Sequence, residues 1–279
     1  MSSLLAKLDT RRFGPWALVT GASSGIGREF ARQIAANGIN VVLVARRLNL
    51  LEQAGRTFAR DYGVAYRAVR ADLSREGFLA TLADATQGLD IGLVVSNAGT
   101  ATPGPFLKQD PQEGLRLFKL NAQAHLEMSR HFAPGLAARG RGGLVLTGAM
   151  GATRAVPYVV TDSAAKAYVQ TLGVGLNYEL APLGVDVTVL VVGPTQTAII
   201  DKFGLDPETM PMKPMSVEQC VYEGLGALKK NRPTFINGRM NRIMDALIPV
   251  GLSKRMMKMM MEKGLAAGLA ADGGKPSAR

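Results

Sequence analysis

The residue pattern best suited to chemistry in this chain is a glycine-rich turn, Thr-Gly-Ala-Ser-Ser-Gly-Ile-Gly, at residues 20–27. It follows an apolar run at 16–19 and leads into a segment with apolar residues at helical spacing. Between a strand and a helix, Gly21 permits the chain to leave the strand in a tight turn. Gly25 lets the backbone approach a pyrophosphate, and Gly27 allows the helix to pack closely on the strand. Free N–H groups of the first helical turn then face the phosphates. Plain strand–helix connections use similar turns, but this context favours a dinucleotide site.

Two arginines, Arg46 and Arg47, come just past a second apolar run at 40–45. In dinucleotide folds, this strand end carries the group that faces the adenosine ribose. An acid there would bond the 2′-hydroxyl of NAD, whereas a guanidinium matches a 2′-phosphate in charge and geometry. Two solvated arginines would explain the charge but not the missing acid. The pattern therefore favours NADP(H) over NAD.

The elements that must position these residues alternate along the chain. A helix is expected at 48–62, and a strand at 64–69 ends near Asp72. Asp72 could accept a hydrogen bond from an adenine amino group, cap a helix that begins near Ser74, or do both. The remaining elements expected are strands at 91–96, 143–147 and 185–192, a helix that carries Asn121 in its interior, and helices at 161–180 and 216–230.

Alternating units of this length predict a Rossmann-type α/β fold, a doubly wound parallel sheet that is open to ligand at its strand ends. No linker divides the chain. We therefore expect a short N-terminal segment at 1–13, a single domain at 14–240, and a C-terminal helical extension at 241–279. Within the domain, residues 196–215 are expected to cover the substrate, with Met210, Met212 and Met215 forming an adaptable apolar surface.

Composition narrows the classes of function. The chain has 279 residues and one cysteine, Cys220, which excludes an internal disulfide and fits a reducing compartment. There is no signal-like N-terminus and no apolar run of the roughly 18 residues that span a bilayer. We expect a cytoplasmic protein. The net charge is +11, but few aromatic residues and no nucleic-acid module accompany it, so nucleic acid is not an expected partner.

The basic character is concentrated in the last 41 residues, where eight Lys or Arg face three Asp or Glu. An amphipathic helix is expected there, with Leu252, Met256, Met259 and Met260 on one face and Lys254, Arg255, Lys258 and Glu262 opposite. Such a helix can make weak contact with an anionic membrane surface. Docking onto its own domain or onto a second subunit is the other interpretation, which we slightly favour. Residues from Asp272 onward are expected to be disordered.

Taken together, residues 14–240 resemble the short-chain dehydrogenase/reductase family. The resemblance is carried by the glycine turn, Asp72-Leu73, Asn97-Ala98-Gly99, Asn121 and Lys166. It implies a nicotinamide cofactor and a homo-oligomer, either a dimer or a tetramer. It also implies that Lys166 bonds the nicotinamide ribose, that Asn121 holds a water in a proton relay, and that Thr197 contacts the carboxamide. The residues expected at the cofactor are Gly21, Ser23, Ser24, Gly25, Ile26, Gly27, Arg46, Arg47, Asp72, Leu73, Asn97, Ala98, Gly99, Thr147, Lys166, Thr195 and Thr197.

Two residues of the family's chemistry are replaced. A tyrosine is expected four residues before the lysine, on the same helical face, but Asp162 stands there. A serine is expected thirteen residues earlier, and that residue is Ala149. Thr147 has a hydroxyl but lies two positions too early. Tyr158 is eight residues from the lysine and is expected to line the substrate pocket instead.

The catalytic residues we expect are Asp162, Lys166 and Asn121, with no metal. A carboxylate one turn from Lys166 should have its pKa lowered and be ionised at neutral pH. It then cannot donate a proton, so ordinary ketone reduction should be poor. An iminium accepts hydride without a proton donor, and Asp162 would stabilise its charge. Alternatively, Asp162 is a general base, or burial raises its pKa and restores an acid role.

Three functions follow from these residues. The first is an NADPH-dependent oxidoreductase that reduces a carbonyl, or more readily an imine or iminium, of an apolar small molecule. The second keeps the nucleotide site but catalyses isomerisation or cyclisation with Asp162 as base. The third is a nucleotide-binding protein without catalysis, in which Asp162 is a helix-terminal acid paired with Lys166.

Overall fold

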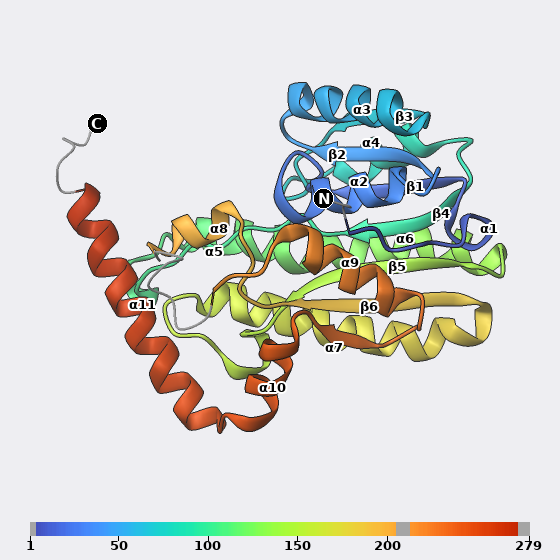
Figure 1. Cartoon of the computed structure of the whole chain (residues 1–279). Coiled ribbons are helices and arrows are strands. Elements are labelled where there is room, and N and C mark those ends of the chain that lie inside the picture. Colours follow the sequence, from blue (N-terminus) through green and yellow to red (C-terminus); the bar gives the residue numbers. More distant parts are fainter. Residues whose placement is uncertain (1–3, 205–212, 273–279) are drawn as a thin grey trace.

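A seven-stranded, all-parallel sheet forms the centre of the computed structural model, which describes residues 4–204 and 213–272 (Figure 1). The strands are β1 (Trp16–Thr20), β2 (Asn40–Ala45), β3 (Tyr66–Arg70), β4 (Ile91–Ser96), β5 (Gly142–Ala149), β6 (Val185–Val192) and β7 (Thr234–Ile236). Their spatial order is β3-β2-β1-β4-β5-β6-β7. This doubly wound order confirms the predicted Rossmann-type fold. Strand β7 was not predicted, because its three residues carry too short a pattern to recognise.

The main helices are α1 (Thr10–Phe13), α2 (Gly25–Ala35), α3 (Leu48–Tyr62), α4 (Phe78–Thr86), α5 (Pro111–Phe118), α6 (Ala124–Ala138), α7 (Val160–Leu180), α8 (Ala198–Lys202), α9 (Val217–Leu228), α10 (Arg239–Leu247) and α11 (Val250–Asp272). The helix expected near Ser74 begins only at Phe78. The reason is local, since Asp72 accepts hydrogen bonds from the N–H and hydroxyl of Ser74 and closes a turn there. Gly77, with φ +81°, then redirects the chain into the helix.

Helices cover both faces of the sheet. One core unites α2, α3 and α9 with the strands, through side chains such as Phe30, Leu51 and Leu225. The other unites α4, α6 and the end of α7, with Leu82 and Met128 among its fully buried members. Because both faces are covered, the central strands are apolar along their whole length rather than at alternate residues.

The order of the strands determines where a ligand site can form. Strands β1 and β4 are direct neighbours, although the chain leaves β1 toward β2 on one side and reaches β4 on the other. In open α/β sheets the crevice beyond the carboxyl ends of two such strands is the preferred ligand position. The glycine turn follows β1, and Asn97-Ala98-Gly99 follows β4. The fold therefore brings these two motifs to the same crevice.

The C-terminal helices lie apart from the sheet, and α11 forms a long rod along one side of the molecule (Figure 1). Its packed side differs from the apolar face expected from the sequence. Met261 is 2% exposed and Gly264 is also buried, whereas Met256 and Met259 are 42% and 57% exposed. The helix docks onto its own domain, but by another side than the apolar face expected, and docking of that face onto a second subunit stays a prediction. Within residues 4–204 and 213–272, no helix combines the length and apolarity needed to cross a bilayer.

Two glycines of α7 provide a test of how closely this helix packs on the sheet. A methyl group on Gly173 would strike Val189 and lie 3.1 Å from Leu146, whereas one on Gly175 would meet nothing within 4 Å. Gly173→Ala should lower the free energy of unfolding by about 1–3 kcal/mol through overpacking. Gly175→Ala should raise it by about 0.5–1 kcal/mol through helix propensity. Urea unfolding of both variants measures the difference, and equal effects would contradict the packing.

Candidate active site

The glycine turn has the backbone conformation that its sequence requires. Gly21 and Gly25 have φ of +69° and +55°, in the left-handed region that favours glycine. A side chain on Gly27 would strike the carbonyl of Gly21 and lie 2.6 Å from Nδ2 of Asn97. Helix α2 begins at Gly25, and its N-cap Ser24 makes no side-chain bond to the helix. The first N–H groups of α2 are therefore available to an anion placed before them.

One buried hydroxyl joins the two motifs at the crevice. Thr20, at the end of β1, accepts hydrogen bonds from the backbone N–H groups of Asn97 and Ala98, at 2.9 and 3.0 Å. The side chain of Asn97 donates in return to the carbonyl of Thr20, at 3.2 Å. Oδ1 of Asn97 also accepts a 3.3 Å bond from the hydroxyl of Thr147 on β5. The ends of β1, β4 and β5 are thus held in a fixed relation.

The arginines expected at the adenosine end lie beside the glycine turn. Arg47 donates to the hydroxyls of Ser23 and Ser24, at 3.0 and 3.1 Å. Arg46 is exposed and contributes to the charge around Asp72. Burial alone would raise the pKa of Asp72, but hydrogen bonds from Ser74 and these positive charges hold it below its usual value. The end of β2 is therefore basic and carries no acid.

The carboxyl of Asp162 meets the amide of Asn121, although 41 residues separate them. Nδ2 of Asn121 donates to Oδ1 of Asp162 at 2.6 Å. The same amide bonds the backbone of Thr100 twice, to its N–H at 3.0 Å and to its carbonyl at 2.6 Å. Asn121 lies in a single π-helical turn, Lys119–Gln123, between α5 and α6. Such turns occur often at functional sites, and this one carries the buried amide that reaches Asp162.

Lys166 completes the group from the next turn of α7. Its Nζ donates to the carbonyl of Thr147 at 2.8 Å, and the residue is 7% exposed. A methyl group on Gly99 would lie 3.3 Å from Nζ of Lys166 and 3.2 Å from Oδ1 of Asn121. Gly99 therefore provides the space in which the lysine and the asparagine converge. The three residues expected to be catalytic are brought together.

Lys166 lowers the pKa of Asp162 as expected, but of the two effects weighed from the sequence, burial is the larger. Burial raises the pKa of the Asp162 carboxyl above its usual value, and this outweighs the lowering by the charge of Lys166 and the Asn121 hydrogen bond. Burial likewise lowers the pKa of Lys166, against the raising effect of Asp162. Both groups are driven toward their neutral forms. The Asp162 carboxyl accordingly keeps its proton to a higher pH than a solvated aspartate.

The two positions at which the resemblance predicts a serine and a tyrosine are Ala149 and Asp162, and neither residue has a hydroxyl side chain. Ala149 ends β5, and the hydroxyl of Thr147 is directed to Asn97. Tyr158 has φ +66° and donates from its hydroxyl to Oε1 of Glu262 on α11, at 2.7 Å. That hydrogen bond is the main cause that raises the pKa of Tyr158. Its hydroxyl is therefore engaged by the tail rather than by Lys166.

The segment after β6 frames the same crevice. Thr197 lies against the glycine turn, since its Cγ2 would be 3.7 Å from a methyl group on Gly25. Thr195 is buried, and its hydroxyl donates to the carbonyl of Gly193 at 2.9 Å. The expected cofactor contact of Thr195 is therefore not available through a free hydroxyl. Met215 pairs in a short bridge with Thr195, whereas Met210 and Met212 lie outside the described residues.

Helix α11 contacts the segment that follows β6. A side chain on Gly204, after α8, would strike the backbone carbonyl of Gly264 on α11. Lys202, on α8, donates to the hydroxyl of Thr100 at 2.7 Å. Together with the Tyr158–Glu262 bond, these contacts place α11 at the border of the crevice. The sequence did not reveal this border, because its partners lie more than fifty residues apart.

A histidine that sequence reasoning missed lies behind the site. His125 is 1% exposed, and neither ring nitrogen has a hydrogen-bond partner within the described residues. Burial, and then the charge of Lys166, lower its pKa well below the usual value, so the ring is neutral. It follows Asn121 by four residues, the spacing that places two side chains on one helical face. That spacing was the available signal.

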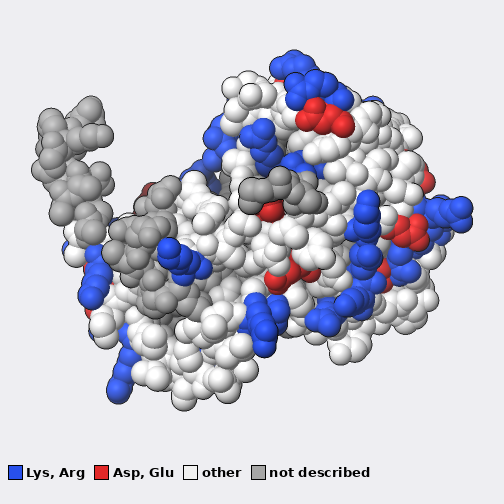
Figure 2. All heavy atoms as spheres, viewed as in Figure 1, with Lys and Arg blue, Asp and Glu red and all other residues white. Residues whose placement is uncertain are grey.

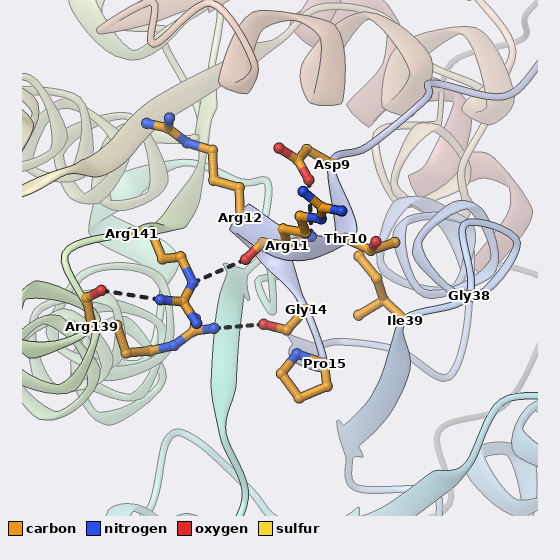
Figure 3. A pocket seen from close by; sticks show the side chains of 10 residues that line it. All are labelled: Asp9, Thr10, Arg11, Arg12, Gly14, Pro15, Gly38, Ile39, Arg139 and Arg141. Carbon is orange, nitrogen blue, oxygen red and sulfur yellow. Dashed lines mark hydrogen bonds between the residues drawn. The ribbon is translucent and has the colours of Figure 1, made fainter.

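Another hollow, of about 760 Å³, lies at the opposite edge of the sheet (Figure 3). It is lined by the segments that precede β1, β2 and β5, including Arg12, Arg139 and Arg141. Arg12 pairs with Asp186 at 2.7 Å, and Arg139 donates to the carbonyl of Gly14 at 2.7 Å. These arginines join strand ends and loops, and none of the expected site residues lies there. No metal-binding cluster of His, Cys, Asp or Glu occurs in the described parts of the chain.

Comparisons with known proteins agree on one protein family for this chain. Residues 15–207 match the family described as short chain dehydrogenase. A very-long-chain 3-oxoacyl-CoA reductase from Neurospora crassa is 34% identical over 196 residues, which represent 67% of this chain and 59% of the relative. The matched region therefore spans about three fifths of that relative's length.

Two solved structures share the architecture. One, described as giving insights into 7beta-hydroxysteroid dehydrogenase stereoselectivity, aligns with a TM-score of 0.82 and 28% identity, over 91% of this chain and 99% of that one. The other is a short-chain dehydrogenase from Sphingobium yanoikuyae in complex with NADPH. It aligns with a TM-score of 0.75 and 30% identity, over 95% of this chain and 98% of that one.

The Thr20 hydroxyl provides a test of how the crevice is held together. Thr20→Val removes the acceptor of two backbone N–H groups in a fully buried position, so it should lower the free energy of unfolding by about 2–4 kcal/mol. The matched control is Thr57→Val on α3, whose hydroxyl only bonds back to the carbonyl of Gln53. It should change stability by less than about 1 kcal/mol. Similar urea midpoints for the two variants would contradict this role of Thr20.

Proposed function

This chain belongs to the short chain dehydrogenase family, and from that premise we propose that it is an NADPH-dependent oxidoreductase. It transfers hydride to a carbonyl or imine group of an apolar small molecule. The observation that carries the proposal is the convergence of Asn121, Asp162 and Lys166 at the carboxyl edge of the sheet, beside the glycine turn. A polar group of this kind, buried next to a dinucleotide crevice, has the composition of a hydride-transfer site.

The crevice fits NADP(H) in its own geometry. Gly25 has a φ of +55° that favours glycine, and the uncapped start of α2 offers N–H groups to a pyrophosphate. Arg46 and Arg47 at the end of β2 would hold the 2′-phosphate, and the absence of an acid there disfavours the 2′-hydroxyl of NAD. Asp72 would face the adenine, and Asn97, Ala98 and Gly99 the nicotinamide half. The NADPH bound to the Sphingobium relative supports this assignment.

The catalytic roles we propose depend on the protonation of Asp162. Bound NADPH supplies hydride to the substrate. We assign Asp162 as the proton donor to the developing alkoxide or amine, because its raised pKa keeps the carboxyl protonated to a higher pH. Lys166 would bond the ribose hydroxyls, and Asn121 orients the Asp162 carboxyl through their 2.6 Å bond. The argument for preferring an iminium required an ionised Asp162, and the raised pKa weakens that preference, so we propose both carbonyl and imine substrates.

An apolar substrate is proposed from both the relatives and the tail. The Neurospora relative is named for very-long-chain acyl substrates, and the structure most like this one in the comparisons above is named for a steroid. Thr197 lies against the glycine turn, and α11 meets Gly204 and Tyr158 at the border of the same crevice. We also propose a homo-oligomer, since Leu126, Tyr168 and Tyr178 leave apolar surface exposed on α6 and α7. A cytoplasmic location agrees with the single, buried Cys220.

A second candidate function is favoured by the same raised pKa. A carboxylate with a higher pKa is a stronger base, so an ionised Asp162 could remove an acidic C–H proton in an isomerisation or cyclisation. In that case, substrate conversion would proceed without net NADPH oxidation. Nucleotide binding without turnover of any substrate would leave only the third function, a non-catalytic binding protein.

Asp162→Asn distinguishes these functions. If Asp162 is a proton donor, kcat for reduction should fall as pH rises through its pKa, which lies above the ordinary value of about 4. The variant should lose that pH dependence and at least about 100-fold in kcat. NADPH oxidation measured against matched ketones and cyclic imines gives both quantities. Asp84→Asn, at an exposed position on α4, is the control and should behave as the unchanged protein.

Other outcomes of this measurement are equally informative. Activity that rises with pH, with conversion but no NADPH oxidation, would favour the base. Imine reduction lost in Asp162→Asn, with ketones inert to both proteins, would favour a cationic substrate beside an ionised Asp162. Ketone reduction unchanged in Asp162→Asn would contradict every role assigned to this carboxyl.

The arginines test the choice of cofactor. Arg46→Ala with Arg47→Ala should weaken NADPH binding by about tenfold or more, because a charge-assisted hydrogen bond contributes about 1.5–3 kcal/mol. NADH binding should change little, since NADH lacks the 2′-phosphate. Arg60→Ala, at the far end of α3, removes a similar exposed charge and serves as the control. Quenching of tryptophan fluorescence or calorimetry measures both affinities, and an equal loss for NADH and NADPH would contradict the assignment.

A further inference from the structure

The C-terminal helices expose a row of large apolar side chains. On α11, Leu252, Met256 and Met259 are 53%, 42% and 57% exposed, and Leu247 at the end of α10 is 74% exposed. These three residues of α11 are spaced by four and three positions, so they share one helical face. Apolar residues that are exposed singly are ordinary, but a continuous row on a helix indicates a partner surface.

The row is exposed because α11 is anchored by its other side. Met261 is buried, the backbone of Gly264 meets Gly204, and Glu262 accepts the hydroxyl of Tyr158. The preceding helix, α10, is anchored as well, because Arg154 donates to the carboxylate of Asp245 at 3.0 Å. The exposed row therefore does not result from a helix that stands free of the domain. It is the outward face of a helix whose inward face is already occupied.

Positive charges lie around the rest of α11, with Arg255 and Lys263 nearest to this row and Lys254 and Lys258 on the other side of the helix. Lys254, Arg255, Lys258 and Lys263 are all exposed, and basic side chains stand out along the side of the molecule where α11 lies (Figure 2). Glu262 is the one acid between Val250 and Ala266, and its carboxylate lies 3.6 Å from Lys258 while also accepting the bond from Tyr158. Within the described residues, no ion pair involves Lys254 or Arg255. The surface thus combines apolar contact area with an excess of unneutralised positive charge.

A second copy of the chain does not complement this surface. A twofold contact through the row would place the same patch on both subunits, so the basic residues of one α11 would face those of the other. A partner must instead offer apolar contact and negative charge together. The surface of a bilayer that contains anionic lipids does so, because an amphipathic helix can bury its apolar side chains at the headgroup boundary while its cations meet phosphates and carboxylates.

We propose that α11 binds the surface of anionic lipid membranes, with the exposed row of Leu252, Met256 and Met259 as its apolar contact and the exposed Lys254, Arg255 and Lys258 supplying positive charge around it. The helix lies in the plane of the interface and does not cross the bilayer. Binding is reversible and decreases with ionic strength, because exposed charges are screened within about 8–10 Å at 0.1–0.15 M salt. The proposal concerns binding alone and does not depend on which reaction the site catalyses.

Co-sedimentation of the full chain with lipid vesicles tests the proposal. The chain should bind phosphatidylcholine vesicles that contain about 30% phosphatidylserine, bind pure phosphatidylcholine vesicles much less, and be released at about 0.5 M salt. Lys254→Glu with Arg255→Glu should weaken binding to the anionic vesicles by about 30-fold or more, since each cation contributes about fivefold and its reversal adds repulsion. Leu252→Ser with Met256→Ser should weaken it by about tenfold or more.

Matched variants separate this face from the rest of the basic protein. Lys229→Glu with Lys230→Glu makes the same change in net charge on exposed residues after α9, and Leu183→Ser removes an exposed apolar side chain that precedes β6. Both should bind anionic vesicles as the unchanged chain does, and unfolding midpoints within a few degrees would show that all variants are folded. Equal loss of binding in the controls, or no binding to anionic vesicles, would overturn the proposal. So would dissociation of a homo-oligomer by Leu252→Ser with Met256→Ser, because the row would then be a subunit interface.

Discussion

The site depends on two opposite charges that share a space from which most water is excluded. Burial raises the pKa of Asp162 and lowers that of Lys166, so it favours the neutral form of each group. Hydrogen bonds from neighbouring groups offset the free-energy cost of burying these two residues. Asn121 holds the carboxyl, and the carbonyl of Thr147 holds the ammonium. A carboxyl in this position can serve the role that a phenol serves elsewhere in the family, provided that it stays desolvated.

The sheet supplies the rigidity for this arrangement. Strand β5 presents the carbonyl that anchors Lys166, and β1 presents the hydroxyl of Thr20 that anchors the turn after β4. Gly99, in that turn, leaves room for the lysine and the asparagine to meet. The reacting groups and the glycine turn thus depend on the same three strand ends. A distortion at one of them would displace both the cofactor crevice and the proton donor.

The sequence predicts most of this arrangement, because strand order and the motifs after β1 and β4 follow from local patterns. Lys166 and Asp162 were placed correctly by their spacing on one helix. Their protonation could not be predicted, since the spacing reveals the nearby charge but not the burial that outweighs it. The packed side of α11 was missed for a similar reason. Its methionines lie on more than one side of the helix, and only the contacts of Met261, Gly264 and Glu262 determine which side faces inward. His125 was overlooked because no motif contains it.

The contact between Gly204 and Gly264 has a consequence for how this enzyme can diversify. A side chain on Gly204 would strike the backbone of Gly264, so Gly204 cannot accept one unless α11 moves. Substitutions in the segment after β6 and in α11 are therefore coupled during evolution. The strand ends that hold Asp162, Lys166 and the glycine turn share none of these contacts. In the function proposed above, substitutions in these two segments would alter the substrate range and leave the reacting groups unchanged.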